Sequence, residues 1–177
     1  SPWFVLKFRN QMAADNDAAN EWLESVSKIM QQVFSRSNFQ QEIFELYHDL
    51  IAFGTAALFI ADDDENELRF KNIHISEIYI TENEKGFVDS LPRKFKMQAK
   101  NIYNAFPGVD LPEELAKKFN KAPYDNISII HSVYPSTEYT NNKYVSCYVH
   151  EESGFLLSEK NFKEFPYAVP RYLKSSN

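Results

Sequence analysis

Cysteine and glycine are both scarce in this chain of 177 residues. The single cysteine, Cys147, excludes an intrachain disulfide and suits a reducing compartment. The four glycines lie far apart, at positions 54, 86, 108 and 154. Phosphate-binding loops need several glycines close together, so the sequence excludes Walker-type and dinucleotide-binding loops.

Long apolar runs and an excess of basic charge are missing as well. The longest apolar candidate, residues 50–61, is shorter than the roughly 18 residues of a membrane span and is interrupted by Gly54. The first residues lack the basic start of a signal peptide. The net charge is −6, from 25 acidic and 19 basic residues. Because proteins bind nucleic acids largely by neutralising phosphates, this charge disfavours a dedicated DNA- or RNA-binding domain.

The composition is that of an ordinary globular protein with many aromatic residues. Hydrophobic residues make up 44 % of the chain and charged residues 25 %. The length predicts one domain over residues 1–177, large enough to bury a core without a disulfide or a metal ion. Aromatic residues reach 15 %, with 15 Phe and 10 Tyr. Surplus apolar surface of this kind favours contacts with protein partners.

The spacing of apolar residues near 3.6 predicts two helices at the start of the chain. The first covers about residues 15–34, and the second follows a break at residues 35–38. Ser37 and Gln40 form a capping-box pattern at the start of the second helix. Two helices joined by a short break predict an αα-hairpin.

Gly54 has a specific predicted role at the end of the second helix. The periodic helix face runs up to Phe53 and a strand-like run starts at Ala56, so we expect Gly54 to end the helix at positive φ. A Cβ in that conformation costs about 1 kcal/mol or more. Because apolar residues flank a turn that we expect to be packed, Gly54→Val should destabilise the chain more than Gly86→Val in an exposed turn.

After Gly54 the pattern changes to one typical of strands and hairpins. Strands are predicted over residues 56–61, 68–75, 77–82, 87–97, 126–134, 144–151 and 155–160. Two short helices are predicted over residues 98–106 and 111–120, the second with Asp110 and Glu113 as a capping box. The sequence therefore predicts an α+β fold, with an N-terminal αα-hairpin followed by a mainly antiparallel sheet with two short helices.

Residues with catalytic or metal-binding chemistry are few, and each has a structural interpretation. The acidic run at residues 62–67 begins like a calcium loop, but Glu67 and Ile73 stand where that loop needs glycine and glutamate. Cys147 lies in a strand-like run, whereas reactive cysteines lie at helix starts or in electropositive clefts. The histidines lack the short spacing of zinc ligands; they are His48, His74, His131 and His150. We therefore predict no catalytic, cofactor-binding or metal-binding residue, and no cofactor.

Two further groups of side chains have ordinary interpretations. Four aromatic residues at helical spacing are interpreted as core: Phe39, Phe44, Tyr47 and Phe53. Lysines gather only around residues 94–100 and 117–121, beside acidic or neutral residues, so we expect weak binding to duplex DNA at most. Two alternatives stay open, a hydrolase that acts through His131 or His150 and a general protein-interaction module. A pocket that encloses a histidine and a carboxylate would favour the hydrolase.

Several stretches, taken in order, resemble one protein family. They are Trp3-Phe4-Val5-Leu6, Trp22-Leu23, Ser37-Asn38-Phe39, residues 43–50, 53–58 and 77–83, residues 86–89 with Arg93, Phe95 and Met97, residues 129–135 and 162–167, and Arg171-Tyr172. The order resembles the head-to-tail connecting (portal) proteins of podovirus-type bacteriophages, nearly from end to end. No single motif carries the resemblance, but the ordered set is fairly specific.

The resemblance implies a structural protein of the virion without catalytic activity. Portal proteins form a ring, usually of twelve copies, at one capsid vertex, and the double-stranded DNA genome passes through it during packaging and ejection. The implied partners are the other copies, the terminase, the capsid and tail adaptor proteins, with no sequence-specific DNA contact and no membrane. The host cytoplasm is the implied place of assembly, and a negative surface suits a channel along which DNA slides.

The family also implies that the chain is a piece of a longer protein. Family members continue beyond the position of Arg171-Tyr172 into stem helices and a clip, so we expect the chain to be the wing region alone. Because obligate interfaces are large, losing part of one can abolish assembly. We therefore expect the chain by itself to be a monomer or a weak oligomer.

Overall fold

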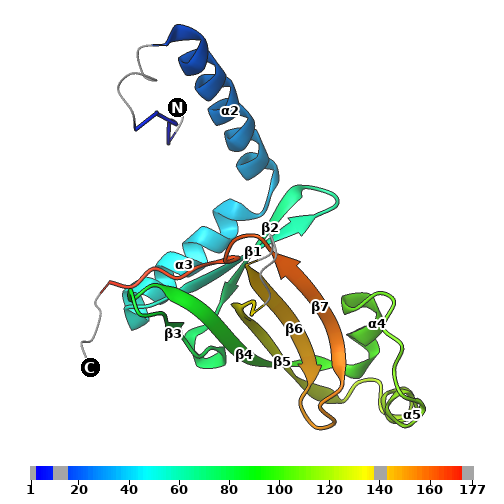
Figure 1. Ribbon diagram of the computed structural model, residues 1–177. Helices are drawn as coiled ribbons and strands as arrows, with labels where there is room; N and C mark the ends of the chain where they lie inside the picture. The colour runs from blue at the N-terminus through cyan, green and yellow to red at the C-terminus, as the bar shows by residue number, and fades with distance from the viewer. Residues whose placement is uncertain (1–2, 10–15, 138–142, 173–177) are drawn as a thin grey trace. The chain divides into compact units, whose positions relative to one another are not determined.

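The computed structural model describes residues 3–9, 16–137 and 143–172. The chain divides into two compact units, Ser1–Asn72 with Pro170–Asn177 and Ile73–Val169. The predicted α+β class is confirmed, since helices occur together with two antiparallel sheets (Figure 1). The expectation of a single domain stays a prediction, and each unit is described by itself.

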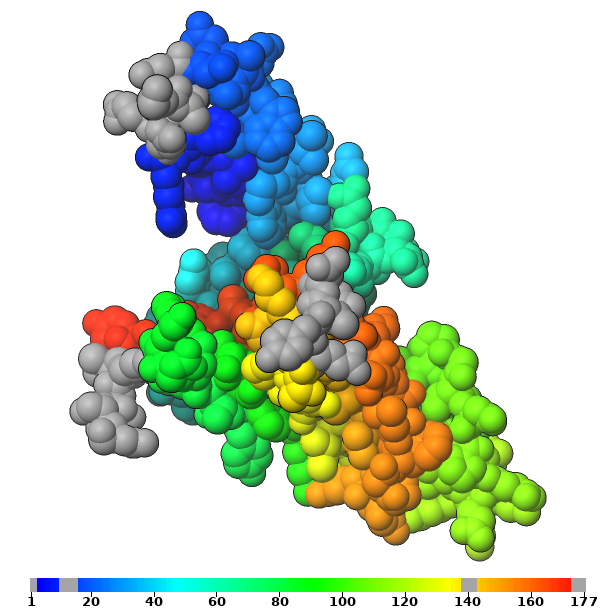
Figure 2. Space-filling model, in the orientation of Figure 1, coloured from blue at the N-terminus to red at the C-terminus, as the bar shows by residue number. Residues whose placement is uncertain are grey.

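The first unit begins with two helices, α2 (Asp17–Arg36) and α3 (Phe39–Phe53). They join at a short break and diverge from it (Figure 1). Residues 3–9 lie along α2, where the backbone N–H of Leu6 donates a 3.1 Å hydrogen bond to Ser27 Oγ. Figure 2 shows this segment in dark blue against the lighter blue of α2. The contact explains why Ser27 is buried in a helix whose other residues are at least partly accessible.

One face of α3 packs on the hairpin formed by β1 (Ala57–Asp63) and β2 (Glu67–Ile73). The buried members of this core are Leu46, Ala56, Leu58 and Phe70. Aromatic rings extend it, with Phe34 and Phe39 both within 6 Å of the Phe70 ring centroid. The core of the first unit is therefore formed between α3 and the hairpin.

Polar side chains near the start of α3 hold strand β2. The Phe70 N–H donates to Asn38 Oδ1 at 2.9 Å, and Asn38 Nδ2 donates to the Phe70 carbonyl at 2.8 Å. Two residues further on, the Asn72 N–H donates to Glu42 Oε2 at 2.6 Å. The Asn72 side-chain amide also donates to the buried carboxylate of Asp49 at 2.8 Å. Helix and strand are thus joined by hydrogen bonds as well as by apolar contact.

Gly54 ends α3 as predicted. Its φ is +73°, and its N–H donates to the Leu50 carbonyl at 2.9 Å, so the predicted left-handed cap is confirmed. A Cβ at Gly54 would meet no atom within 4 Å, so the packed turn that we predicted around it is absent. Gly86 also has positive φ, at +75°. Backbone strain therefore applies at both glycines, and at Gly54 a new Cβ adds no packing conflict to that strain.

Both predicted capping boxes are wrong. The N-cap of α3 is Asn38, one residue after Ser37, and its Oδ1 accepts the N–H of Phe70 in β2 instead of an N–H of the helix. Helix α5 (Glu113–Lys121) begins after Pro112, too late for Asp110 to cap it. In both cases the chain turns into the helix later than the local side-chain pattern indicates.

The second unit contains a five-stranded antiparallel sheet in the order β3-β4-β5-β6-β7. Its strands are β3 (Thr81–Glu82), β4 (Val88–Gln98), β5 (Asn126–Pro135), β6 (Tyr144–His150) and β7 (Leu156–Phe162). The shorter elements are η1 (Ile75–Glu77), η2 (Ala99–Asn101), α4 (Ile102–Ala105) and β8 (Tyr167–Ala168). The predicted helix over residues 98–106 is thus η2 followed by α4.

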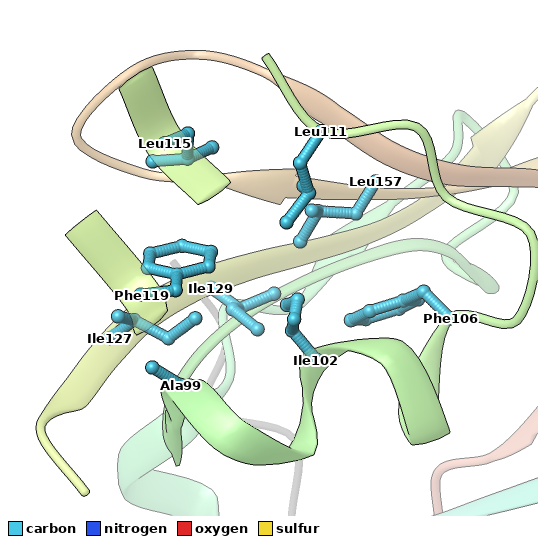
Figure 3. Close-up of a cluster of buried hydrophobic side chains, with 9 residues drawn as sticks. All are labelled: Ala99, Ile102, Phe106, Leu111, Leu115, Phe119, Ile127, Ile129 and Leu157. Atoms are coloured by element: carbon cyan, nitrogen blue, oxygen red, sulfur yellow. The ribbon is translucent and has the colours of Figure 1, made fainter. Parts of the chain in front are cut away.

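One face of this sheet carries the main core of the second unit. Alternate residues of β5, from Ile127 to Val133, are buried, as expected for a strand with one face covered. Helices α4 and α5 supply the cover (Figure 3). The buried members are Ala99, Ile102, Phe106, Leu111, Leu115, Phe119, Ile127, Ile129 and Leu157.

Candidate functional site

A buried polar cluster continues this sheet face around His131. Arg93, His131 and Tyr148 lie side by side on β4, β5 and β6. The rings of His131 and Tyr148 stack with centroids 3.9 Å apart and an interplanar angle of 4°. His131 Nε2 lies 2.9 Å from Ser146 Oγ, and Nδ1 lies 3.2 Å from the Tyr167 hydroxyl. Four segments that are distant in the sequence therefore meet at one imidazole.

The Ser146–His131 contact has the geometry of a nucleophile and its general base. However, Ser146 and His131 are only 2 % and 0 % exposed, so the described surface offers a substrate no access to them. The group behind the imidazole is a phenol and not a carboxylate. Burial raises the pKa of Tyr167, against the opposing effect of the Arg93 charge, so the phenol stays protonated. We interpret the cluster as a hydrogen-bonded part of the core.

Arg93 is the buried cation of this cluster. It is 4 % exposed, and its guanidinium carbon lies 4.1 Å from the centroid of the Phe95 ring. The Arg93 charge opposes the rise in the pKa of the Tyr167 phenol, and among the described residues Nε of Arg93 has no hydrogen-bond partner. The face of the Phe95 ring thus lies against this positive charge, which has no ion pair to a carboxylate among the described residues.

A pocket of about 430 Å³ lies where α5, the start of β5 and the turn after β6 meet. His150 lines it, with Nδ1 at 2.8 Å from Ser153 Oγ and its ring in edge-to-face contact with the Phe119 ring. Burial lowers the pKa of His150, so the imidazole is neutral at pH 7. Glu151 and Glu152 also line the pocket. The structure therefore brings together a histidine and carboxylates, as the hydrolase alternative requires.

Both glutamates of this pocket are paired with lysines, one of which, Lys118, lines the same pocket, and Asp125 is a third carboxylate of the lining. Glu151 pairs with Lys94 and Glu152 with Lys118, and each hydrogen bond from a lysine lowers the pKa of its carboxyl. Both glutamates are accessible to solvent. Among the described residues, no carboxylate is hydrogen-bonded to His150. The pocket thus holds acid and base groups without assembling them into a catalytic pair.

The other candidate residues are placed much as predicted. Cys147 is half-buried in β6, and burial raises the pKa of its thiol, which argues against a reactive thiolate. The acidic run covers the end of β1, the turn at residues 64–66 and the first residue of β2. His48 is exposed on α3, and His74 precedes η1. Within the described residues, no three His, Cys, Asp or Glu side chains are placed to hold a metal ion, and no helix has the length and hydropathy of a membrane span.

The interpretation of four aromatic residues as core is wrong for three of them. Phe39 packs in the first unit, but Phe44, Tyr47 and Phe53 are 74 %, 54 % and 51 % exposed. The spacing correctly predicts a helix, but apolar residues occupy more than one face of it. Sequence reasoning also missed the polar contacts of Asn38 with β2, because the only local signal there is a helix cap.

Comparison with known proteins gives a consistent family. Residues 1–177 match the family model described as "Bacteriophage head to tail connecting protein". The chain is 28 % identical to the portal protein of Salmonella phage epsilon15, over 97 % of this chain and 33 % of that protein. It is 23 % identical to the probable portal protein of Bordetella phage BPP-1, over 77 % of this chain and 25 % of that protein. The chain spans a third or less of these relatives, and it belongs to the family of bacteriophage head to tail connecting proteins.

Proposed function

We propose that the chain is the wing region of a phage portal protein, a structural component of the ring through which the genome is packaged and ejected. The observation that carries the proposal is the family match over all 177 residues. Two relatives named as a portal protein and a probable portal protein support it. The implied location is the portal vertex of the virion, with assembly in the host cytoplasm.

The ring consists of twelve copies of the whole protein in this proposal. Its partners are the terminase, which supplies ATP hydrolysis, the capsid and the tail adaptor proteins. The wing serves as a folded support in such a ring and needs no chemistry of its own. The sealed Ser146–His131 contact and the lysine-bound carboxylates beside His150 support a non-enzymatic role.

The surface charge supports passage of DNA without tight binding. The net charge of the chain is −6. The two groups of lysines around residues 94–100 and 117–121 are partly neutralised, since Lys94, Lys117 and Lys118 each form an ion pair with a glutamate. A surface with few free cations releases few counterions on contact with phosphates, so it does not hold DNA.

The test is the assembly state of the natural, full-length protein. We expect light scattering to give the mass of about twelve copies and electron microscopy to show closed rings. The 177-residue chain alone should be a monomer or a weak oligomer at the same concentration. A full-length protein that stays monomeric at micromolar concentrations, or that forms open filaments only, would contradict the proposal.

A further inference from the structure

Helix α3 is apolar around more of its circumference than a helix with one buried face needs. At 3.6 residues per turn, Phe44, Tyr47 and Ile51 fall within about 60° of one another. They are 74 %, 54 % and 86 % exposed, while Leu46 on the inner side is buried. We call these three exposed residues the α3 stripe. A surface helix carries one apolar face, so a second apolar face indicates a second contact.

The α3 stripe is also free of carboxylates. Gln40 falls inside the same arc, and the accessible acid of the helix, Glu45, lies about 120° from the centre of the stripe. Each copy of the chain carries a net charge of −6, so copies repel one another over most approaches. An uncharged, aromatic surface is where two such copies can meet with the least electrostatic cost.

We propose that the α3 stripe is a contact surface for a neighbouring copy of the same chain. The inference rests on the proposed ring and names one of its subunit contacts. In a ring the contact is heterologous, so the stripe meets a different surface of the neighbour and not another α3 stripe. A point mutation on α3 therefore weakens one side of every interface in the ring.

The area of the stripe is consistent with a contact that works only in a closed ring. A fully exposed aromatic side chain can bury about 150–250 Å², so the three side chains together offer roughly 400 Å². A stable pair of proteins buries about 800 Å² on each partner. The stripe thus supplies about half of one interface, which explains why the chain alone is expected to be a monomer or a weak oligomer.

The experiment uses the natural, full-length protein. Ile51→Glu and Phe44→Glu each place a charge in the stripe, and Gln41→Glu adds the same charge on an exposed position of α3 about 80° from Ile51 and about 60° from Phe44. We expect the concentration for half-assembly, measured by light scattering, to rise at least about tenfold for the two stripe variants and to stay unchanged for Gln41→Glu. Unchanged thermal midpoints of the dissociated proteins would show that the fold is intact.

A cross-linking measurement keeps the proposal testable even if the charged variants misfold. A photo-reactive amino acid at position 51 is activated in rings mixed from isotope-labelled and unlabelled chains. Cross-links between labelled and unlabelled chains support the contact. Cross-links confined to one chain, cross-links to a different protein, or stripe variants that assemble like the wild type would overturn it. If the wild type forms no ring, the proposed function fails first.

Discussion

Replacing Asn38 with alanine should lower the free energy of unfolding of the first unit by about 2–4 kcal/mol. The side chain makes two hydrogen bonds to the backbone of Phe70, at 2.9 Å and 2.8 Å. An intramolecular hydrogen bond contributes about 1 kcal/mol net, and a buried group left without a partner costs about 1–3 kcal/mol. Phe70 is only 3 % exposed, which limits the access of water and favours the upper part of the range.

Asn38→Asp should be more destabilising than Asn38→Ala at neutral pH. The aspartate keeps the shape of the side chain but puts an oxygen where Nδ2 now donates to the Phe70 carbonyl. The same Nδ2 lies 3.2 Å from Glu42 Oε1, so the new carboxylate would face a second one. Asn66→Ala is the matched control, because its side chain bonds to Asp63, three residues away in the same hairpin, and its effect should be within about 0.5 kcal/mol.

Urea unfolding followed by tryptophan fluorescence measures these changes in the right unit. Both tryptophans, Trp3 and Trp22, belong to the first unit. The Trp3 ring stacks on Phe39, next to Asn38, with centroids 5.7 Å apart. Circular dichroism on the same samples reports on the whole chain. An Asn38→Ala protein within about 0.5 kcal/mol of the wild type, or an Asn38→Asp protein as stable as the wild type, would refute the reasoning.

Four further outcomes follow from the structure. Gly54→Ala and Gly86→Ala should each lower the free energy of unfolding in urea by about 1–2 kcal/mol, because both residues have positive φ. If neither variant is less stable than the wild type, this reasoning is wrong. Because the pKa of His150 is lowered in the folded chain, the contribution of the neutral imidazole to stability is present above pH 6.5 and is lost as the pH falls through the folded pKa. His150→Gln should therefore flatten the loss of stability between about pH 7.5 and 5. Identical pH profiles of stability for the wild type and the variant would contradict this. Ile129→Ala should cost about 3 kcal/mol and Leu156→Ala less than 1 kcal/mol in urea unfolding followed by circular dichroism, which also reports on the second unit, since Ile129 is fully buried and Leu156 is 46 % exposed. Fluorescence anisotropy with duplex DNA should give a Kd weaker than about 10 μM at physiological salt, and a tighter, salt-sensitive Kd would argue against the charge reasoning.

Local features of the fold were predictable from the sequence because they depend on neighbouring residues. The two helices follow from the spacing of apolar side chains, and the conformation of Gly54 follows from where that spacing stops. The exposure of Phe44 was not predictable in the same way. Periodicity identifies a helix with apolar faces, but which face is covered depends on contacts made elsewhere in the chain.

Features that depend on contacts distant in the sequence escaped prediction. Asn38 looks like part of a helix start, yet its side chain binds Phe70, which is 32 residues away. The cluster around His131 depends on the register between β4, β5 and β6, and on Tyr167, 36 residues further along the chain. Strand register is set by the whole sheet, so no short pattern in the sequence contains it.

The pairing of Asn38 with β2 restricts how subunits can join. Where side chains of α3 occupy the backbone groups of Phe70 and Asn72, those groups cannot accept a strand from another chain. Growth by adding strands, the usual route from a free sheet edge to uncontrolled aggregation, is therefore blocked at this point. In the proposed ring, contacts between copies at this edge of β2 must therefore use folded surfaces, which can fix their orientation.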